Sequence, residues 1–182
     1  MTVAMTSGDR RLQTAATAEA MKIRDAVEAD LPAIVTIYNA AVATRIATAQ
    51  LELVTVESRR NWLTEHSPDR HPFWVAEIDG KVAGWLTIKG FIARAAYDGM
   101  VELSVYVDDV FRRRGVARAL LQEAIARAPA LGIRAMVGLI FTHNEPSLRL
   151  FAQLGFTRWG FLPDVAILDG VHRDLAILGR HI

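Results

Sequence analysis

Polar and apolar side chains alternate along residues 101–107, where the sequence reads VELSVYV. This pattern predicts a strand with Glu102, Ser104 and Tyr106 on one face, because successive strand side chains point to opposite faces. The other face is apolar and has the composition of a core. A carboxylate on an open face can take a proton from a bound substrate, although a structural ion pair is the alternative role for a strand glutamate.

A turn suited to an anion follows this strand, with the sequence RRRGVA at residues 112–117. Gly115 lets the backbone approach a ligand closely, and Ala117 keeps the next position small. Backbone N–H groups at the start of the helix that follows, reinforced by its dipole, can bind a phosphate. Three arginines add positive charge. An ordinary surface turn with three solvated arginines is an equally good interpretation of this stretch alone.

The elements that must position these residues follow from hydrophobic periodicity and turn signals. Strands are predicted at 22–26, 73–78, 81–88, 101–107 and 133–140 and around Phe161 and Leu175, and helices around 31–38 and at 56–66, 115–131 and 145–154. Asp79-Gly80 and Asp169-Gly170 are typical of two-residue hairpin turns. A strand–helix–strand unit at the centre of this order predicts a mixed α/β sheet.

Composition limits the class of protein. Of 182 residues, 52% are apolar and 23% are charged, which is typical of a globular enzyme. A net charge of +1 gives no reason to expect nucleic acid or an anionic membrane as a partner. The chain has no cysteine, and His66, Asp69 and His71 match no standard metal spacing, so no metal site is expected.

The first twenty residues are rich in Ala, Thr, Ser and Gly and show no clear period. We expect 1–20 to be a disordered or loosely docked extension and 21–182 to be a single domain. No apolar run approaches the roughly 18 residues that span a bilayer, and the start of the chain lacks the apolar core of a secretory signal. A cytoplasmic location is therefore expected.

Several linked motifs resemble those of the GNAT superfamily of acetyltransferases. The R-x-x-G-x-A turn that opens a long helix is similar to its acetyl-CoA motif, and Asn144-Glu145-Pro146-Ser147 and Leu154-Gly155-Phe156 are similar to the start and end of its next helix. The stretches ARAAYD at 93–98, ELSVYV at 102–107 and NEPSLRL at 144–150 narrow the resemblance to the phosphinothricin and methionine sulfoximine acetyltransferase branch. The resemblance implies the GNAT fold, an α/β fold with a mixed, mostly antiparallel sheet of about seven strands. Two central strands would splay apart, and about four helices would flank the sheet.

The same resemblance implies acetyl-CoA as the cosubstrate. Its pantetheine arm would lie between the splayed strands as a substitute strand, and its pyrophosphate would lie on the amides of the turn. The implied cofactor-binding residues are Val105, Tyr106, Val107, Arg112, Arg113, Arg114, Gly115, Val116, Ala117, Arg118, Asn144 and Ser147. A plain helix N-cap is an equally good interpretation of Asn144, and both roles can hold.

Glu102 resembles the general base of this branch, which takes a proton from the acceptor amine so that its nitrogen attacks the thioester directly. The residues expected to line the acceptor site are Thr44, Thr48, Arg94, Tyr97 and Ser104. An arginine at position 94 could pair with a substrate carboxylate, and an exposed loop pair is the alternative for Arg94 and Tyr97.

The expected activity is acetyl transfer to the amine of a small molecule, such as an amino acid or an analogue like phosphinothricin or methionine sulfoximine. Acetylation of a protein N-terminus or lysine is an alternative, and so is a non-catalytic sensor that binds acyl-CoA. A homodimer is expected as well, because the last strands, with Val165 and His172, often form a dimer in this branch.

Some positions depart from the pattern of the branch. Phe151 stands where relatives carry histidine or tyrosine, and phenylalanine cannot donate a proton to the leaving thiolate. The proton would then come from solvent or from Tyr106. Arg45, Ile46 and Ala49 interrupt a loop that is rich in threonine in relatives. These changes predict a more apolar acceptor pocket and make phosphinothricin itself a doubtful substrate.

Overall fold

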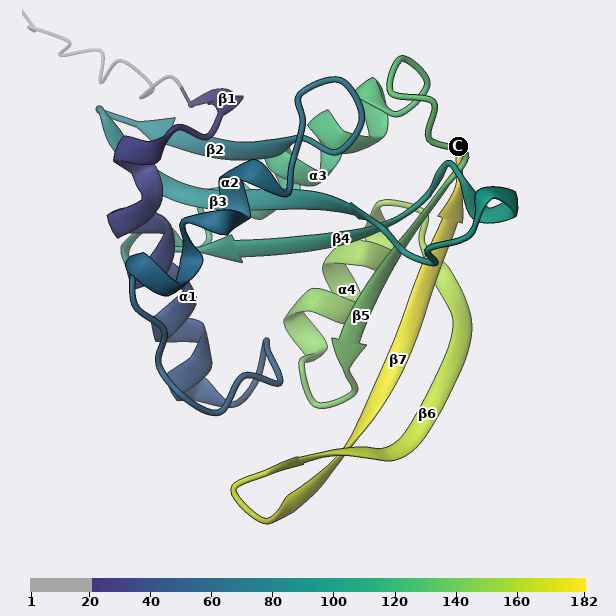
Figure 1. The fold of residues 1–182 in the computed structure, drawn as a ribbon. Helices are drawn as coiled ribbons and strands as arrows, with labels where there is room; N and C mark the ends of the chain where they lie inside the picture. The colour runs from purple at the N-terminus through teal and green to yellow at the C-terminus, as the bar shows by residue number, and fades with distance from the viewer. Residues whose placement is uncertain (1–20) are drawn as a thin grey trace, which may run out of the picture.

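The structure is a computed structural model that describes residues 21–182, and it is organised around one seven-stranded sheet (Figure 1). The strands are β1 (Lys22–Asp25), β2 (Phe73–Ile78), β3 (Lys81–Gly90), β4 (Met100–Val107), β5 (Ala135–Phe141), β6 (Thr157–Leu168) and β7 (Val171–His181). Their order is β1-β2-β3-β4-β5-β7-β6, and β4 with β5 is the parallel pair among antiparallel ones. The mixed, mostly antiparallel sheet is confirmed. The expectation for residues 1–20 lies outside the described part of the chain.

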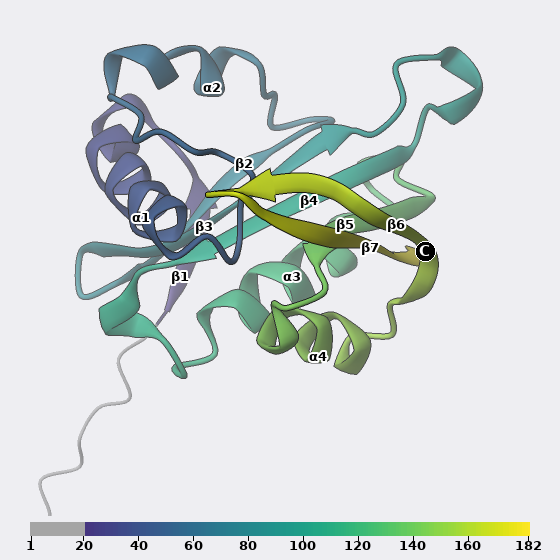
Figure 2. The ribbon, with the colours of Figure 1, turned by 90° about the horizontal axis from the view of Figure 1, so that it is seen from below.

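Helices cover both faces of the sheet. They are α1 (Leu31–Thr44), α2 (Asn61–Thr64), α3 (Val116–Arg127) and α4 (Glu145–Gln153). Figure 2 shows α1 and α2 on one face and α3 and α4 on the other. Two buried apolar clusters result, a larger one under α3 and α4 and a smaller one under α1 and α2.

The pleat of the two central strands sorts their side chains between these clusters. Tyr106 on β4 and Trp85 on β3 are directly paired, and both belong to the cluster under α1 and α2. Their neighbours Val105 and Leu86 point to the opposite face and pack under α3 and α4. The alternation predicted for 101–107 is therefore confirmed, and the polar side chains of β4 share the face of α1.

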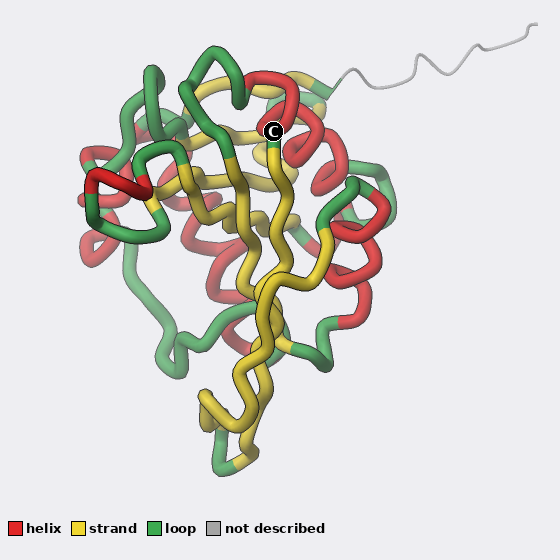
Figure 3. Tube along the Cα trace, turned by 90° about the vertical axis from the view of Figure 1, so that its right-hand side faces the viewer, coloured by secondary structure: helices red, strands yellow, loops and turns green. Residues whose placement is uncertain are grey.

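Both predicted hairpin turns are present, and their backbone explains the sequence. Asp79 and Gly80 have φ angles of 50° and 72°, and Asp169 and Gly170 have φ angles of 49° and 80°. Two successive positive φ angles define the turn that matches the twist of paired strands, and Asp-Gly tolerates them well. Figure 3 shows the hairpin of β6 and β7 extending beyond the rest of the sheet.

Two predicted helices are shorter than expected. The helix predicted at 56–66 is a 3-10 turn, Glu57–Arg59, followed by the single turn α2. Helix α2 stops because the His66 ring forms a hydrogen bond with the Trp62 carbonyl. The chain then reverses direction through an isolated β-bridge between Ser67 and His71.

The helix predicted at 115–131 also ends early, at Arg127. Pro129 has no N–H to continue the helical hydrogen-bond ladder, although Ala128 before it keeps helical dihedral angles. The segment closes at Gly132, whose φ is 70°, with a bond from the Ile133 N–H to the Ala128 carbonyl. This hydrogen bond around a left-handed glycine is the common way in which a helix ends, and here it lies one turn after the last residue of α3.

Candidate active site

The central strands separate at one point on the sheet. β4 and β5 pair only through Met100–Glu102 on one strand and Ala135–Val137 on the other. Beyond Glu102 the two strands diverge, as Figure 1 shows, while each keeps its outer partner along its length. The facing edges of residues 103–107 and 138–141 therefore carry backbone groups without a partner strand, and such groups require other partners.

Glu102 lies at the last paired position, where this opening begins. Its carboxylate is on the α1 face with Ser104, and it is half-buried. Burial raises the pKa of the Glu102 carboxyl above its usual range, while the charge of Lys89 on the neighbouring strand opposes the rise. A carboxylate with a raised pKa is a stronger base than an exposed one and suits proton abstraction.

Aromatic side chains form the wall of the site beyond Glu102. The Tyr106 ring centroid lies 4.5 Å from that of Trp85 and 5.3 Å from that of Tyr38. Tyr38 in turn meets Trp62 edge-on at 5.2 Å. Burial raises the pKa of the Tyr106 hydroxyl well above its usual range, so the phenol keeps its proton. Aromatic rings therefore line this face of the sheet, and a more apolar acceptor pocket stays a prediction.

The loop after α1, residues 45–50, folds over this wall. The hydroxyls of Tyr38 and Thr48 lie 2.9 Å apart, and the Tyr106 hydroxyl donates to the Ala47 carbonyl at 3.5 Å. Thr48 therefore contacts the aromatic residues beyond Glu102, and a role for it in acceptor binding stays a prediction. Thr44 is exposed and bonds to the Ala41 carbonyl at the end of its own helix, 2.7 Å away.

Arg45 ties this loop to two distant parts of the chain. Its guanidinium donates to the Asp169 carboxylate in the β6–β7 turn at 2.8 and 3.3 Å. Its carbonyl accepts from His143 Nε2 at 3.1 Å. Sequence reasoning missed this junction, because the partners are 124 and 98 residues away and no local pattern reveals such contacts.

The turn between β4 and α3 contains the glycine on which the predicted anion site depends, and its role in binding an anion stays a prediction. Gly115 is the N-cap of α3 with a φ of 80°, and it gives no side-chain cap. The first amides of α3 are therefore left for a ligand. Gly84 lets α3 approach β3, because a Cβ there would lie 2.9 Å from Val116 Cγ1 and 2.7 Å from the Tyr106 carbonyl oxygen. This close packing holds the turn beside the end of β4.

The arginines of the turn are exposed and have different local contacts. Arg112 forms an ion pair with Asp109 at 2.6 Å. The Arg114 guanidinium lies over the Phe111 ring at 5.2 Å. Arg118 is further along α3 and donates to a glutamine of α4. Positive charge therefore surrounds the exposed glycine, as the sequence predicted.

Asn144 is a helix N-cap in this structure. Its side-chain oxygen accepts from the Ser147 N–H at 3.3 Å at the start of α4, and the residue is buried. The N-cap interpretation is confirmed. A contact of Asn144 or Ser147 with a cofactor stays a prediction.

Arg94 and Tyr97 lie in the loop between β3 and β4, at the paired end of β4. Both side chains are exposed. The loop is held by Asp98, whose carboxylate pairs with Arg70 at 2.5 Å and whose carbonyl accepts from Arg134 at 2.5 Å. A role for Arg94 and Tyr97 in acceptor binding stays a prediction.

Phe151 belongs to the core under α4. It is 3% exposed, and its ring stands 4.9 Å from the Phe156 ring. The ring also fills the space beside Gly138, where a Cβ would approach its edge to 2.5 Å. Packing therefore explains the phenylalanine at this position, because its ring occupies the space that Gly138 of β5 leaves free.

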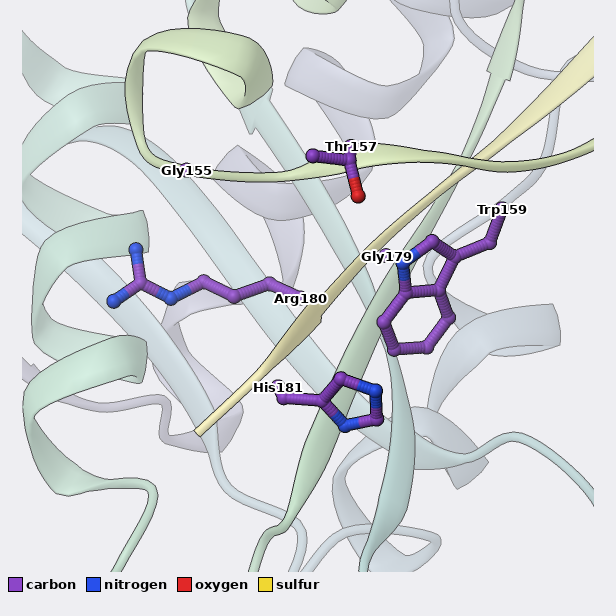
Figure 4. Close-up of a pocket in the computed structure, with 6 residues that line it drawn as sticks. All are labelled: Gly155, Thr157, Trp159, Gly179, Arg180 and His181. Atoms are coloured by element: carbon purple, nitrogen blue, oxygen red, sulfur yellow. The ribbon is translucent and has the colours of Figure 1, made fainter.

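A shallow depression lies elsewhere, near the C-terminal end of β7 (Figure 4). It is lined by Gly155, Thr157, Trp159, Gly179, Arg180 and His181. None of the predicted site residues is among them. Within residues 21–182, no cluster of three potential metal-ligating side chains is found, and no helix there has the length and apolar character to cross a membrane.

Comparison with known proteins identifies the family to which this chain is similar. Residues 34–156 match the acetyltransferase (GNAT) family model. The Bacillus subtilis protein YwnH, provisionally named a phosphinothricin acetyltransferase, is 46% identical over 163 residues, which cover 89% of this chain and 99% of the relative. An L-methionine sulfoximine/L-methionine sulfone acetyltransferase of Pseudomonas aeruginosa is 36% identical, covering 86% of this chain and 91% of the relative.

A solved structure extends the likeness to the fold. A GNAT superfamily phosphinothricin acetyltransferase from Sinorhizobium meliloti, in complex with acetyl-CoA, has a TM-score of 0.84 and 31% identity, covering 89% of this chain and 88% of that one. The splayed strands and the glycine turn thus occur in a chain that matches the family over most of its length. This chain belongs to the acetyltransferase (GNAT) family.

Proposed function

We propose that this protein is an N-acetyltransferase that uses acetyl-CoA to acetylate the amine of a small, carboxylate-bearing molecule. The observation that carries the proposal is the position of Glu102, a half-buried carboxylate at the point where β4 and β5 separate. A base there lies beside the edge of β4 that the cosubstrate would occupy. The amino-acid analogues named for the Pseudomonas aeruginosa relative support the acceptor class.

The described residues fit acetyl-CoA. The open edge of β4 offers backbone groups to the amides of the pantetheine arm, and the amides at Gly115–Ala117 offer donors to the pyrophosphate. From Glu102 to Val107 the strand runs about 17 Å at roughly 3.3 Å per residue, comparable to an extended pantetheine arm. The thioester would then lie near Glu102 when the phosphates lie on the turn.

The reaction removes two protons from the acceptor ammonium and supplies one to the leaving thiolate. The Glu102 carboxylate takes a proton from the acceptor ammonium, directly or through a water, and the freed nitrogen attacks the thioester carbonyl carbon. The attacking nitrogen then loses its second proton to solvent, the tetrahedral intermediate collapses, the C–S bond breaks, and the CoA thiolate leaves. Because burial raises the pKa of Tyr106 well above its usual range, its hydroxyl is a weak proton donor. Solvent is then the source of the proton that the thiolate takes up.

A thiol-release assay with acetyl-CoA tests this function. The acceptors are free amino acids, methionine sulfone, methionine sulfoximine, phosphinothricin, polyamines and short peptides. We expect selective turnover of a carboxylate-bearing small amine, with phosphinothricin a poor acceptor because the Tyr106 wall is apolar. Faster turnover of peptides would instead support a protein acetyltransferase. Acetyl-CoA binding without turnover of any amine would support the sensor alternative.

The glycine of the anion turn gives a separate prediction for cofactor binding. Gly115→Ala should weaken acetyl-CoA binding about tenfold, roughly the value of one amide–phosphate contact, because alanine at a φ of 80° is strained and the turn must shift. Isothermal titration calorimetry measures the affinity. Gly80→Ala is the matched control, because Gly80 also has a positive φ and open space around it but lies in the β2–β3 turn. Equal affinity losses in the two variants would contradict the assignment.

We further propose a homodimer formed through the β6–β7 hairpin. Val165 and Ile167 are 52% and 56% exposed and lie on one face of β6, an edge strand. An exposed apolar row on an unpaired edge is a favourable surface for a second copy. A cytoplasmic location is part of the same proposal, because acetyl-CoA is a cytoplasmic metabolite.

The dimer proposal predicts that charge on this row separates the subunits. The double variant Val165→Lys with Ile167→Lys should elute as a monomer in size-exclusion chromatography with light scattering, whereas wild type elutes as a dimer. Val110→Lys is the control, because Val110 is 75% exposed on another part of the molecule. A wild-type monomer, or a dimer that survives both lysines, would count against this interface.

A further inference from the structure

Lys89 stands directly across from Glu102 on the neighbouring strand β3. The two side chains share the α1 face, because Trp85 and Tyr106, four residues along each strand, are also paired and their rings are in contact there. Directly opposed side chains on antiparallel strands have Cβ atoms about 5 Å apart. The site therefore presents a carboxylate and an ammonium side by side at the point where β4 and β5 separate.

The Lys89 ammonium is only loosely engaged by the protein. It lies 3.5 Å from a carboxylate oxygen of Glu65 at the end of α2, and the two side chains are 49% and 45% exposed. An ion pair this exposed and this long contributes little to stability. The charge of Lys89 thus remains accessible to a ligand that carries a better-placed carboxylate.

This pair of opposite charges is complementary to an α-amino acid. In the zwitterion, the ammonium nitrogen and the carboxylate carbon are both attached to the α-carbon, so the two charges are a few ångströms apart. An acceptor whose amine faces Glu102 would direct its carboxylate toward β3. The first charged side chain in that direction is Lys89.

We propose that Lys89 binds the carboxylate of the acceptor and orients its α-amine toward Glu102. The inference deepens the proposed function and rests on it. Lys89 on β3 would then make the contact with the substrate carboxylate that the sequence analysis expected from Arg94. The side chain of Arg94 is exposed in the loop between β3 and β4. This role of Lys89 also explains how the site would reject polyamines, because Lys89 repels a second positive charge next to the reacting amine.

The test crosses two substrates with variants of the enzyme. Methionine sulfone and its carboxamide differ in the negative charge that Lys89 would bind, and kcat/KM is measured for each with saturating acetyl-CoA. We expect wild type to prefer the carboxylate about 10- to 100-fold, the usual effect of a charge-assisted hydrogen bond. Lys89→Met should lose this preference, Lys89→Gln should do the same, and Lys89→Arg should keep most of it.

The ratio of the two substrates isolates carboxylate recognition. Removing Lys89 also raises the pKa of Glu102, because its positive charge is lost, but that change affects both substrates alike and cancels in the ratio. Lys81→Met is the matched control, since Lys81 is an exposed lysine at the other end of β3, and it should leave the preference unchanged.

Two outcomes would overturn the inference in distinguishable ways. If Lys89→Met and Lys89→Gln acetylate both substrates with the wild-type preference, carboxylate recognition lies elsewhere and the proposed function stands. If wild type acetylates neither substrate nor any other amino acid, the proposed function fails and the inference fails with it. Loss of the preference in Arg94→Met alone would return the role to Arg94.

Discussion

Glu102→Gln is expected to lower kcat by about 10²- to 10⁴-fold, the usual contribution of a positioned general base. The amide has nearly the same shape but cannot accept the proton of the acceptor ammonium. Binding of acetyl-CoA should stay at the wild-type level, because the contacts that we propose for the cofactor lie on the edge of β4 and the turn at Gly115. Thiol release measures turnover, and calorimetry measures affinity. Glu123→Gln on α3, a half-buried glutamate with a weak ion pair to Arg127, is the control.

The pH dependence of turnover should separate a base from a structural carboxylate. Burial raises the pKa of Glu102 above the ordinary glutamate value of 4.5, and the base is active only when it is ionised. Wild-type kcat/KM should therefore fall as the pH drops through this raised pKa, and the Glu102→Gln variant should lack that acid limb. Equal turnover and the same acid limb in both proteins would contradict the assignment.

Phe151→Ala should destabilise the fold by about 3–5 kcal/mol, the usual cost of removing a buried phenylalanine. The ring is 3% exposed, packs against Phe156, and fills the space beside Gly138. Alanine would leave a cavity under β5 that the neighbouring backbone cannot close. Urea denaturation measures the free energy of unfolding.

The same substitution tests whether position 151 takes part in catalysis. Phe151→Leu keeps much of the volume and should lose less stability. Its kcat, measured where the variant is folded, should stay within a few-fold of wild type, because the Phe151 ring lies in the core and cannot donate a proton to the leaving thiolate. A large fall in kcat for a folded Phe151→Leu protein would show that the ring positions the reacting groups.

Features with a local physical cause could be predicted from the sequence. Asp79-Gly80 and Asp169-Gly170 form turns that need two positive φ angles, and few residue pairs other than Asp-Gly and Asn-Gly tolerate them. The face of Glu102 followed from the strict period of two along β4. Gly115 was placed in the turn before the helix because it lets the backbone approach a ligand closely, and the structure adds that it is the left-handed N-cap of α3.

Features that depend on particular side-chain contacts, whether local or distant, could not be predicted in this way. The helix predicted at 56–66 is broken because the His66 ring takes up the Trp62 carbonyl, a contact that periodicity does not reveal. The junction of Arg45 with Asp169 and His143 joins segments about a hundred residues apart. The sequence suggested only that Arg45 departs from its relatives, without a reason for the departure.

The register in which the strands pair also could not be predicted from the sequence. The resemblance implied splayed strands, but the point at which they separate, just after Glu102, comes from the pairing of β4 with β5. The position of Lys89 opposite Glu102 also could not be predicted, because it depends on the alignment of β3 with β4. No sequence motif includes Lys89. A one-residue slip would have placed it on the opposite face.

A crystal structure of the protein with acetyl-CoA tests the central claim most directly. We predict that the pantetheine arm lies between β4 and β5 and the pyrophosphate lies on the turn at Gly115. The thioester carbonyl should then be near Glu102, with room for an amine within hydrogen-bond reach of the carboxylate or one water away. A cofactor bound elsewhere, or an acetyl group remote from Glu102, would contradict the account.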